Sequence, residues 1–131
     1  MKIWKIVTVL LAVLLLAGCV GNVSGAVSEI KITGIDAPAT GVKPDTTAST
    51  STAGITLGTI TWNIGSETTF NAETQYTVTI PVTSKSGYEF AGTVTATVNG
   101  KTAAVSKTTA GVSVSYTFDK TAAATTISEL K

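Results

Sequence analysis

The sequence predicts an all-β protein, an immunoglobulin-like antiparallel β-sandwich of about seven strands preceded by an N-terminal leader. Three observations support this fold class. Apolar and polar residues alternate along five segments in the second part of the chain, and turn-forming residues separate these segments. No stretch after the leader carries apolar residues at helical spacing over three turns. A length of 131 residues suits one domain.

Residues 1–18 have the pattern of a secretion signal peptide. Lys2 and Lys5 give a positive start, and a largely apolar run from Ile6 to Val20 follows them. That run has 15 residues, whereas a helix needs roughly 20 to cross a bilayer. The sequence therefore favours a cleaved leader over a permanent transmembrane helix.

The apolar run ends in Leu16-Ala17-Gly18-Cys19, which resembles the bacterial lipobox. The resemblance implies cleavage between Gly18 and Cys19, a thioether-linked diacylglycerol on Cys19, and often a further acyl chain such as palmitate on the new amino group. Two or three chains anchor a protein stably, because each buried CH₂ contributes about 0.8 kcal/mol. The implied location is the cell membrane or the outer membrane, on the extracytoplasmic side. The alternative is an ordinary secretion signal with a chance cysteine.

The rest of the chain divides into three expected parts. Residues 19–28 form a flexible tether, because small polar residues dominate after the lipidated cysteine. Residues 29–121 form the β-sandwich. Residues 122–131 form a tail that either makes a short helix or frays. The chain has a single cysteine, which excludes an internal disulfide, so packing and sheet hydrogen bonds must stabilise the domain.

Each expected strand turns its apolar side chains to one face of the sheet, and threonine or serine occupies most positions on the other face. This pattern is typical of half-buried antiparallel strands. The expected core, taken in chain order, consists of Ile30, Ile32, Ile60, Trp62, Ile64, Phe70, Tyr76, Val78, Ile80, Val82, Tyr88, Phe90, Val94, Val98, Val105, Val112, Val114, Tyr116 and Phe118.

Turn residues lie between the strands. Asn99-Gly100 predicts a two-residue type I′ hairpin. The inward-facing apolar residues occupy odd positions before Gly58, as at Ile55 and Leu57, and even positions after it, as at Ile60. This change predicts a bulge or bend at Gly58. Pro81 lies inside a good strand pattern but has no amide hydrogen, so its strand is expected at an edge or with a bulge there. Two further turns are expected at Ser86-Gly87 and Ala110-Gly111.

Composition excludes several classes of function. The chain has no arginine and no histidine, and charged residues make up 13%. Nucleic acid is not an expected partner, because phosphate-binding surfaces use clusters of basic residues. Histidine, the commonest general base in enzymes, is missing. We therefore expect neither catalytic residues nor a cofactor beyond the acyl chains on Cys19. No metal site is expected: only calcium would suit oxygen ligands such as Asp36 and Asp45, and these lack the D-x-D-x-D spacing.

The order of motifs resembles a repeated β-module of bacterial cell-surface and S-layer-associated proteins. The resemblance covers roughly residues 30–121 and implies an immunoglobulin-like sandwich used as a spacer or adhesion module, with no catalytic residues to transfer. The matching motifs are Ile32-Thr33-Gly34-Ile35 with Pro38, Gly41-Val42-Lys43-Pro44-Asp45, Ile60-Thr61-Trp62, Phe70 to Ile80, Ser86-Gly87-Tyr88-Glu89-Phe90, Val98-Asn99-Gly100 and Tyr116-Thr117-Phe118.

Two functions are consistent with these observations. The first is a lipid-anchored extracytoplasmic surface protein with a non-catalytic structural or adhesion module. The alternative is a small binding module for carbohydrate, peptidoglycan or an envelope protein. The alternative predicts an exposed aromatic side chain or an unpaired edge strand. The ligand-binding residues themselves are not predicted by the sequence.

Overall fold

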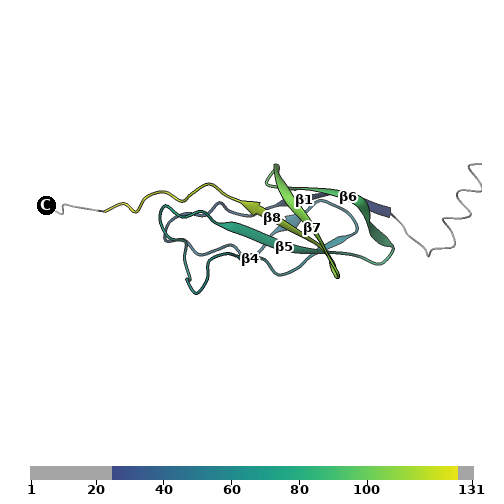
Figure 1. Ribbon diagram of the computed structural model, residues 1–131, viewed down its shortest axis with the longest axis horizontal. Coiled ribbons are helices and arrows are strands. Elements are labelled where there is room, and N and C mark those ends of the chain that lie inside the picture. Colours follow the sequence, from purple (N-terminus) through teal and green to yellow (C-terminus); the bar gives the residue numbers. More distant parts are fainter. Residues whose placement is uncertain (1–24, 127–131) are drawn as a thin grey trace, which may run out of the picture.

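A computed structural model describes residues 25–126 of the chain (Figure 1). The expected signal peptide, Leu16, Ala17, Gly18, Cys19 and the last five residues of the tail lie outside the described residues. Within residues 25–126 all regular elements are β-strands, so the all-β prediction is confirmed there. In chain order the strands are β1 Gly25–Thr33, β2 Ser49–Thr50, β3 Ile55–Leu57, β4 Thr61–Trp62, β5 Thr77–Ser84, β6 Tyr88–Val98, β7 Lys101–Thr108 and β8 Gly111–Thr117.

The strands form one mixed sheet in the order β2-β1-β6-β7-β8-β5-β3, with β4 also paired to β5. The sheet folds over because β7 changes partner along its length. Lys101 to Ala103 pair with β6, whereas Ala104 to Thr108 pair with β8. Figure 1 shows β7 crossing steeply between its two neighbours. The result is a flattened, nearly closed barrel with its core between the two layers.

The prediction of purely antiparallel strands is wrong at one pair. β1 runs parallel to β6, with Ile30 beside Ala96 and Ile32 beside Val98. The other neighbours are antiparallel. Alternation of apolar and polar residues reports which face of a strand is buried, and it is the same whichever way the neighbour runs. The sequence pattern therefore could not reveal this parallel pair.

The domain also begins earlier than the expected boundary at Glu29. β1 starts at Gly25, whose N–H donates to the Gly87 carbonyl at 3.2 Å, and Val27 is buried. A register shift between Val27 and Glu29 interrupts the pairing with β6. The shift puts two residues, Ser28 and Glu29, between the inward-facing Val27 and Ile30, so the period of two is hidden at the start of β1. The flexible tether that we expected over residues 19–28 is therefore incorrect for residues 25–28.

The core contains most of the apolar residues expected there, with differences at its margins. Val78, Ile80, Val98 and Val114 have no exposed surface. Eight expected core residues are only half-buried: Trp62, Ile64, Tyr88, Phe90, Val94, Val105, Tyr116 and Phe118. Four buried apolar residues were not expected: Val27, Ile35, Ile55 and Ala96. The large aromatic rings thus lie around a core of small branched side chains.

Pro81 lies in a central strand and not at an edge. β5 pairs with β8 on one side and with β3 and β4 on the other. The missing amide hydrogen is tolerated because β3 ends at Leu57 and β4 begins at Thr61, so regular pairing lapses opposite Pro81. Gly58 lies in this gap, and its N–H donates to the Pro81 carbonyl at 2.7 Å. A side chain at Gly58 would meet the proline ring. The bulge or bend predicted at Gly58 is confirmed, because the four residue steps from Leu57 to Thr61 lie opposite three steps of β5, from Val82 to Thr79.

The predicted hairpin at Asn99-Gly100 is confirmed. Val98 pairs with Lys101, and both turn residues have positive φ, 49° at Asn99 and 79° at Gly100. These values match a type I′ turn, whose twist suits the two flanking strands. Turns also occur at the other two expected places, between β5 and β6 and between β7 and β8.

Changing Gly100 to alanine is expected to lower the free energy of unfolding by about 1 kcal/mol, because an L-residue is strained at this φ although the surroundings are open. Urea unfolding measures the change. Gly92→Ala is the control, since that position is equally open and has no positive φ. Equal losses in the two variants would contradict the role of turn geometry.

Candidate functional site

The two ends of the domain differ in the length of their connections. At the end where β1 begins, tight turns join the strands near Gly54, Gly87 and Ala110. At the opposite end, long connections span residues 34–48 and 63–76, and the chain leaves the domain there (Figure 1). Because binding residues lie mostly on loops that a rigid scaffold positions, a binding site is expected at the end with the long connections.

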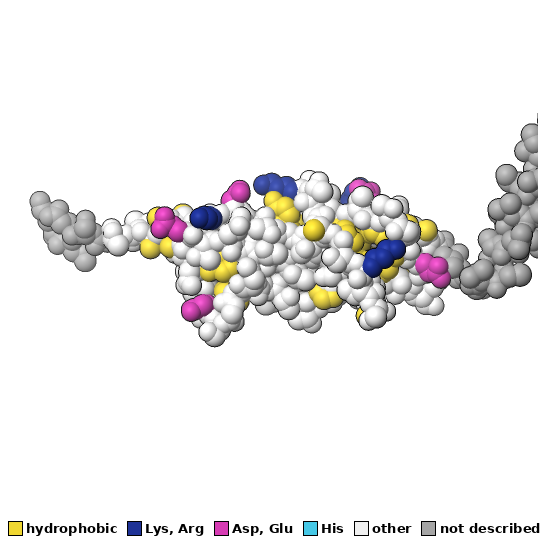
Figure 2. Space-filling model, in the orientation of Figure 1, with side chains coloured by type: hydrophobic (Ala, Val, Ile, Leu, Met, Phe, Trp, Pro, Cys, Tyr) yellow, Lys and Arg dark blue, Asp and Glu magenta, His cyan; other side chains and the backbone are white. Residues whose placement is uncertain are grey.

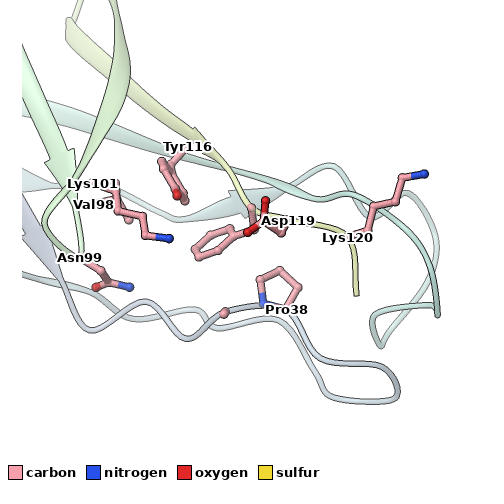
Figure 3. A pocket seen from close by; sticks show the side chains of 9 residues that line it. Pro38, Val98, Asn99, Lys101, Tyr116, Asp119 and Lys120 are labelled. Atoms are coloured by element: carbon pink, nitrogen blue, oxygen red, sulfur yellow. The ribbon is translucent and has the colours of Figure 1, made fainter. Parts of the chain in front are cut away.

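A cleft of about 380 Å³ lies beside the last residues of β8 (Figure 3). It forms where β7 parts from β8: the pairing of these strands stops at Ala104 and Ser115, and the first part of β7 joins β6. β8 therefore continues past Ser115 beside an open space. The cleft is lined by Ala37, Pro38, Val98, Asn99, Lys101, Tyr116, Phe118, Asp119 and Lys120.

Two aromatic rings form one wall of the cleft, and further rings support them from behind. Tyr116 and Phe118 meet edge to face, with ring centroids 4.8 Å apart. Phe118 stacks on Trp62 at 5.6 Å, and Trp62 meets Phe70 at 5.1 Å. The indole N–H of Trp62 donates to the Asp45 carbonyl at 2.8 Å. Such pairs add to the burial energy and restrict the rings, so the wall is rigid.

The opposite wall is fixed by Asn99. Its backbone N–H donates to the Ile32 carbonyl at 2.8 Å, and its side-chain Nδ2 donates to the Ile35 carbonyl. These bonds tie the β6–β7 hairpin to the connection that carries Pro38. The two walls therefore come from segments far apart in the sequence, and each is held in place by bonds outside the cleft.

Three charged side chains surround the cleft: Lys101, Asp119 and Lys120. All three residues are exposed. In Figure 3 the ammonium group of Lys101 extends into the cleft, whereas Lys120 extends away from it. Among residues 25–126 the single ion pair joins Lys31 to Glu29, so none of the three charges has an ionic partner within the described chain. Charged side chains are sparse on the face that Figure 2 shows.

The rim that carries Asp119 and Lys120 is secured by Thr121. Thr121 is 5% exposed as a whole residue, and it is the one polar residue among the buried residues of the described chain. The Thr121 Oγ1 accepts a bond from the Thr74 N–H at 3.0 Å and donates to the Asn71 carbonyl. The backbone N–H of Thr121 donates to the Thr74 carbonyl at 3.0 Å. The chain is thus bound to the neighbouring connection immediately after the cleft.

Replacing Thr121 with valine is expected to lower the free energy of unfolding by about 1–3 kcal/mol, because valine has a similar shape but leaves a part-buried N–H and a carbonyl without this hydroxyl partner. Chemical denaturation measures the change. Thr125→Val is the matched control, because Thr125 is exposed in the same segment. A loss no larger than that of the control would mean that these hydrogen bonds do not hold the rim.

The cleft contains neither of the described residues that the sequence analysis considered for a metal, Asp36 and Asp45. Leu16, Ala17, Gly18 and Cys19 lie outside the described residues. The Asp45 side chain, considered for calcium, accepts a bond from the Asp36 N–H at 2.9 Å, which is the action of a loop-forming aspartate. Residues 25–126 contain no group of three or more acidic or cysteine side chains placed to hold a metal ion.

Sequence reasoning missed the cleft because it assigned Tyr116 and Phe118 to the core. Both continue the alternation of β8, but Phe118 lies one residue past the end of that strand. The Asp119-Lys120 pair directly after these aromatic residues was the available signal of a solvent-facing rim. Among the described residues, no helix has the length and apolar character needed to cross a membrane.

Compared with known protein families, curated proteins and solved structures, the chain matches none of them.

Proposed function

We propose that this chain is a lipid-anchored, extracytoplasmic surface protein with a non-catalytic module that serves structure or adhesion. One observation carries the proposal: Leu16-Ala17-Gly18-Cys19 directly follows a positively charged start and an apolar run. A diacylglycerol on Cys19 would hold the mature chain at the cell membrane or the outer membrane, and the all-β domain would stand outside the cytoplasm.

The position of β1 supports this arrangement. Only residues 20–24 separate Cys19 from the first residue of β1. Six residue steps reach at most about 20 Å in extended chain. The end of the domain with the tight turns would therefore lie close to the lipid surface, and the cleft at the other end would face outward.

For the domain we propose an immunoglobulin-like sandwich in which β7 takes part in both layers. Two packed layers with an apolar interior and tight hairpins favour this classification, as does the order of motifs that resembles bacterial cell-surface modules. The parallel pairing of β1 with β6 is a departure from the purely antiparallel arrangement.

Mass spectrometry of the mature amino terminus tests the proposal. The expected result is a chain that begins at Cys19 and carries the added mass of a diacylglycerol, with or without one more acyl chain. An unmodified start at any other residue would overturn it. An intact leader with no acyl mass would instead favour an N-terminal membrane-spanning segment.

A second function is favoured by the cleft, namely a small binding module for carbohydrate, peptidoglycan or an envelope protein. Ligand sites are concave and combine aromatic surface with a few polar groups, and the cleft has both. Retention of the purified protein on isolated cell walls, glycan arrays and envelope-protein extracts tests this function. Retention on none of the three would leave only the structural role.

A further inference from the structure

We infer that the cleft binds a saccharide that carries a carboxylate, with the sugar ring against Tyr116 and Phe118 and the carboxylate at Lys101. This inference rests on the second function proposed above and names its ligand class. Three groups of residues in the cleft each indicate one part of this ligand: the sugar ring, its hydroxyl groups and its carboxylate.

The aromatic wall of the cleft suits the pyranose ring of the proposed ligand. Tyr116 and Phe118 are half-buried, so part of each ring remains accessible in the cleft. Their position is set by contacts behind them, chiefly the stacking of Phe118 on Trp62. A ring face that is apolar and already ordered can receive the C–H face of a pyranose without loss of further side-chain freedom.

The polar groups around the wall account for the hydroxyls. Within residues 25–126 no hydrogen bond uses the Tyr116 hydroxyl or the Asp119 carboxylate, so both are free to bond a ligand. A carboxylate accepts bonds and a tyrosine hydroxyl both donates and accepts. This combination matches a ligand with several hydroxyl groups around an apolar ring.

The lysines account for the carboxylate. Lys101 extends into the cleft in Figure 3 and has no acidic partner within the described chain. Lys120 adds a second positive charge at the rim, against the single negative charge of Asp119. A carboxylate bound at Lys101 would form a charge-assisted hydrogen bond, and these are stronger than neutral ones.

An extended peptide fits the cleft less well. Added strands need a run of free N–H and carbonyl groups along a sheet edge. The free edge of β8 starts after Ser115 and ends where Thr121 is bound to Thr74. Alternate residues face opposite neighbours, so only Thr117 and Asp119 would present groups to the peptide. The volume of about 380 Å³ lies near the lower limit for small-ligand sites.

Titrations of the full chain, ¹⁵N-labelled and purified in detergent, test the inference by NMR. Two matched pairs of probes separate the carboxylate from the sugar. One pair is tri-galacturonate and its methyl ester, and the other is a muramic-acid disaccharide and the corresponding disaccharide without the lactyl group. The expected result is shifts at Asn99, Lys101 and Phe118 with the acidic member of at least one pair, and binding about tenfold weaker with its neutral member. Which pair responds identifies the source of the carboxylate.

Lys101→Met is expected to weaken binding of the acidic probe about tenfold and to leave the weak binding of the neutral probe unchanged. Lys107→Met is the matched control, because Lys107 is an exposed residue of the same strand outside the cleft. Tyr116→Phe provides a second variant that removes only a hydroxyl and keeps the ring packing.

Several results would overturn the inference. Binding of the acidic and neutral probes with equal affinity would exclude the carboxylate, and shifts outside the cleft would exclude the site. Binding of an acidic peptide in place of any saccharide would exclude the ligand class. If all probes fail while the protein is still retained on cell walls or envelope proteins, the ligand class is wrong but the binding function stands.

Discussion

Replacing Cys19 with alanine is expected to move the mature chain, freed of residues 1–18, from the membrane fraction to the aqueous fraction. The proposed acyl chains are attached through the Cys19 sulfur and through the amino group that cleavage creates, so one substitution prevents both modifications. Each lost CH₂ removes about 0.8 kcal/mol of membrane affinity, and the polar domain supplies no replacement. Partition between a detergent-rich phase and water measures the effect, and we expect the detergent-phase share to fall at least about tenfold.

Val20→Ala is the matched control for this experiment, because it changes the adjacent side chain and keeps the cysteine. The partition of Val20→Ala between the two phases should equal that of the chain with the original sequence. If the Cys19→Ala protein remained in the detergent phase, its mass would show the cause: a chain that keeps residues 1–18 is held by the apolar run, whereas a chain cleaved after Gly18 that still partitions into detergent would contradict the lipid anchor. The experiment therefore distinguishes the lipid anchor from a retained N-terminal helix, which a stability measurement could not do.

Replacing Ile80 with alanine is expected to lower the free energy of unfolding by about 2–5 kcal/mol. Ile80 has no exposed surface, and it lies in β5 directly opposite Val114 of β8. β5 has neighbours on both sides, so the surrounding backbone has little freedom to close the space that a smaller side chain leaves. Linear extrapolation of urea unfolding measures the loss.

Thr83→Ala is the control in the same strand, because Thr83 is exposed and its removal leaves no cavity. We expect a change within about 0.5 kcal/mol. A loss below about 1 kcal/mol for Ile80→Ala would mean that this part of the core is loosely packed.

Local features of the fold could be predicted from the sequence because they depend on near neighbours in the chain. The Asn99-Gly100 turn requires two residues that tolerate positive φ, and these two types are the best suited to it. The strand faces follow from alternation, which holds from Thr77 to Thr83 in β5 and from Gly111 to Ser115 in β8. Pro81, by contrast, predicted an edge strand or a bulge, whereas its strand is central because regular pairing lapses opposite it at Gly58.

Features that depend on distant segments could not be predicted. The parallel pairing of β1 with β6 joins residues more than sixty positions apart, and no local pattern records its direction. Trp62 was correctly assigned to packing, but its contact with Phe118 depends on how the connections fold at one end of the domain. The cleft arises because β7 changes neighbours, which is a property of the whole sheet.

The parallel pairing of β1 and β6 has a mechanical consequence for a tethered protein. If the chain is held at its lipidated end and pulled through a partner at the opposite end, tension enters the domain along β1. The hydrogen bonds between β1 and β6 are spaced along the strand direction, from Gly25 beside Tyr88 to Ile32 beside Val98. They would be loaded together in shear and would not open one after another from an end. Such an arrangement resists extension, as a protein under pulling force at a cell surface requires.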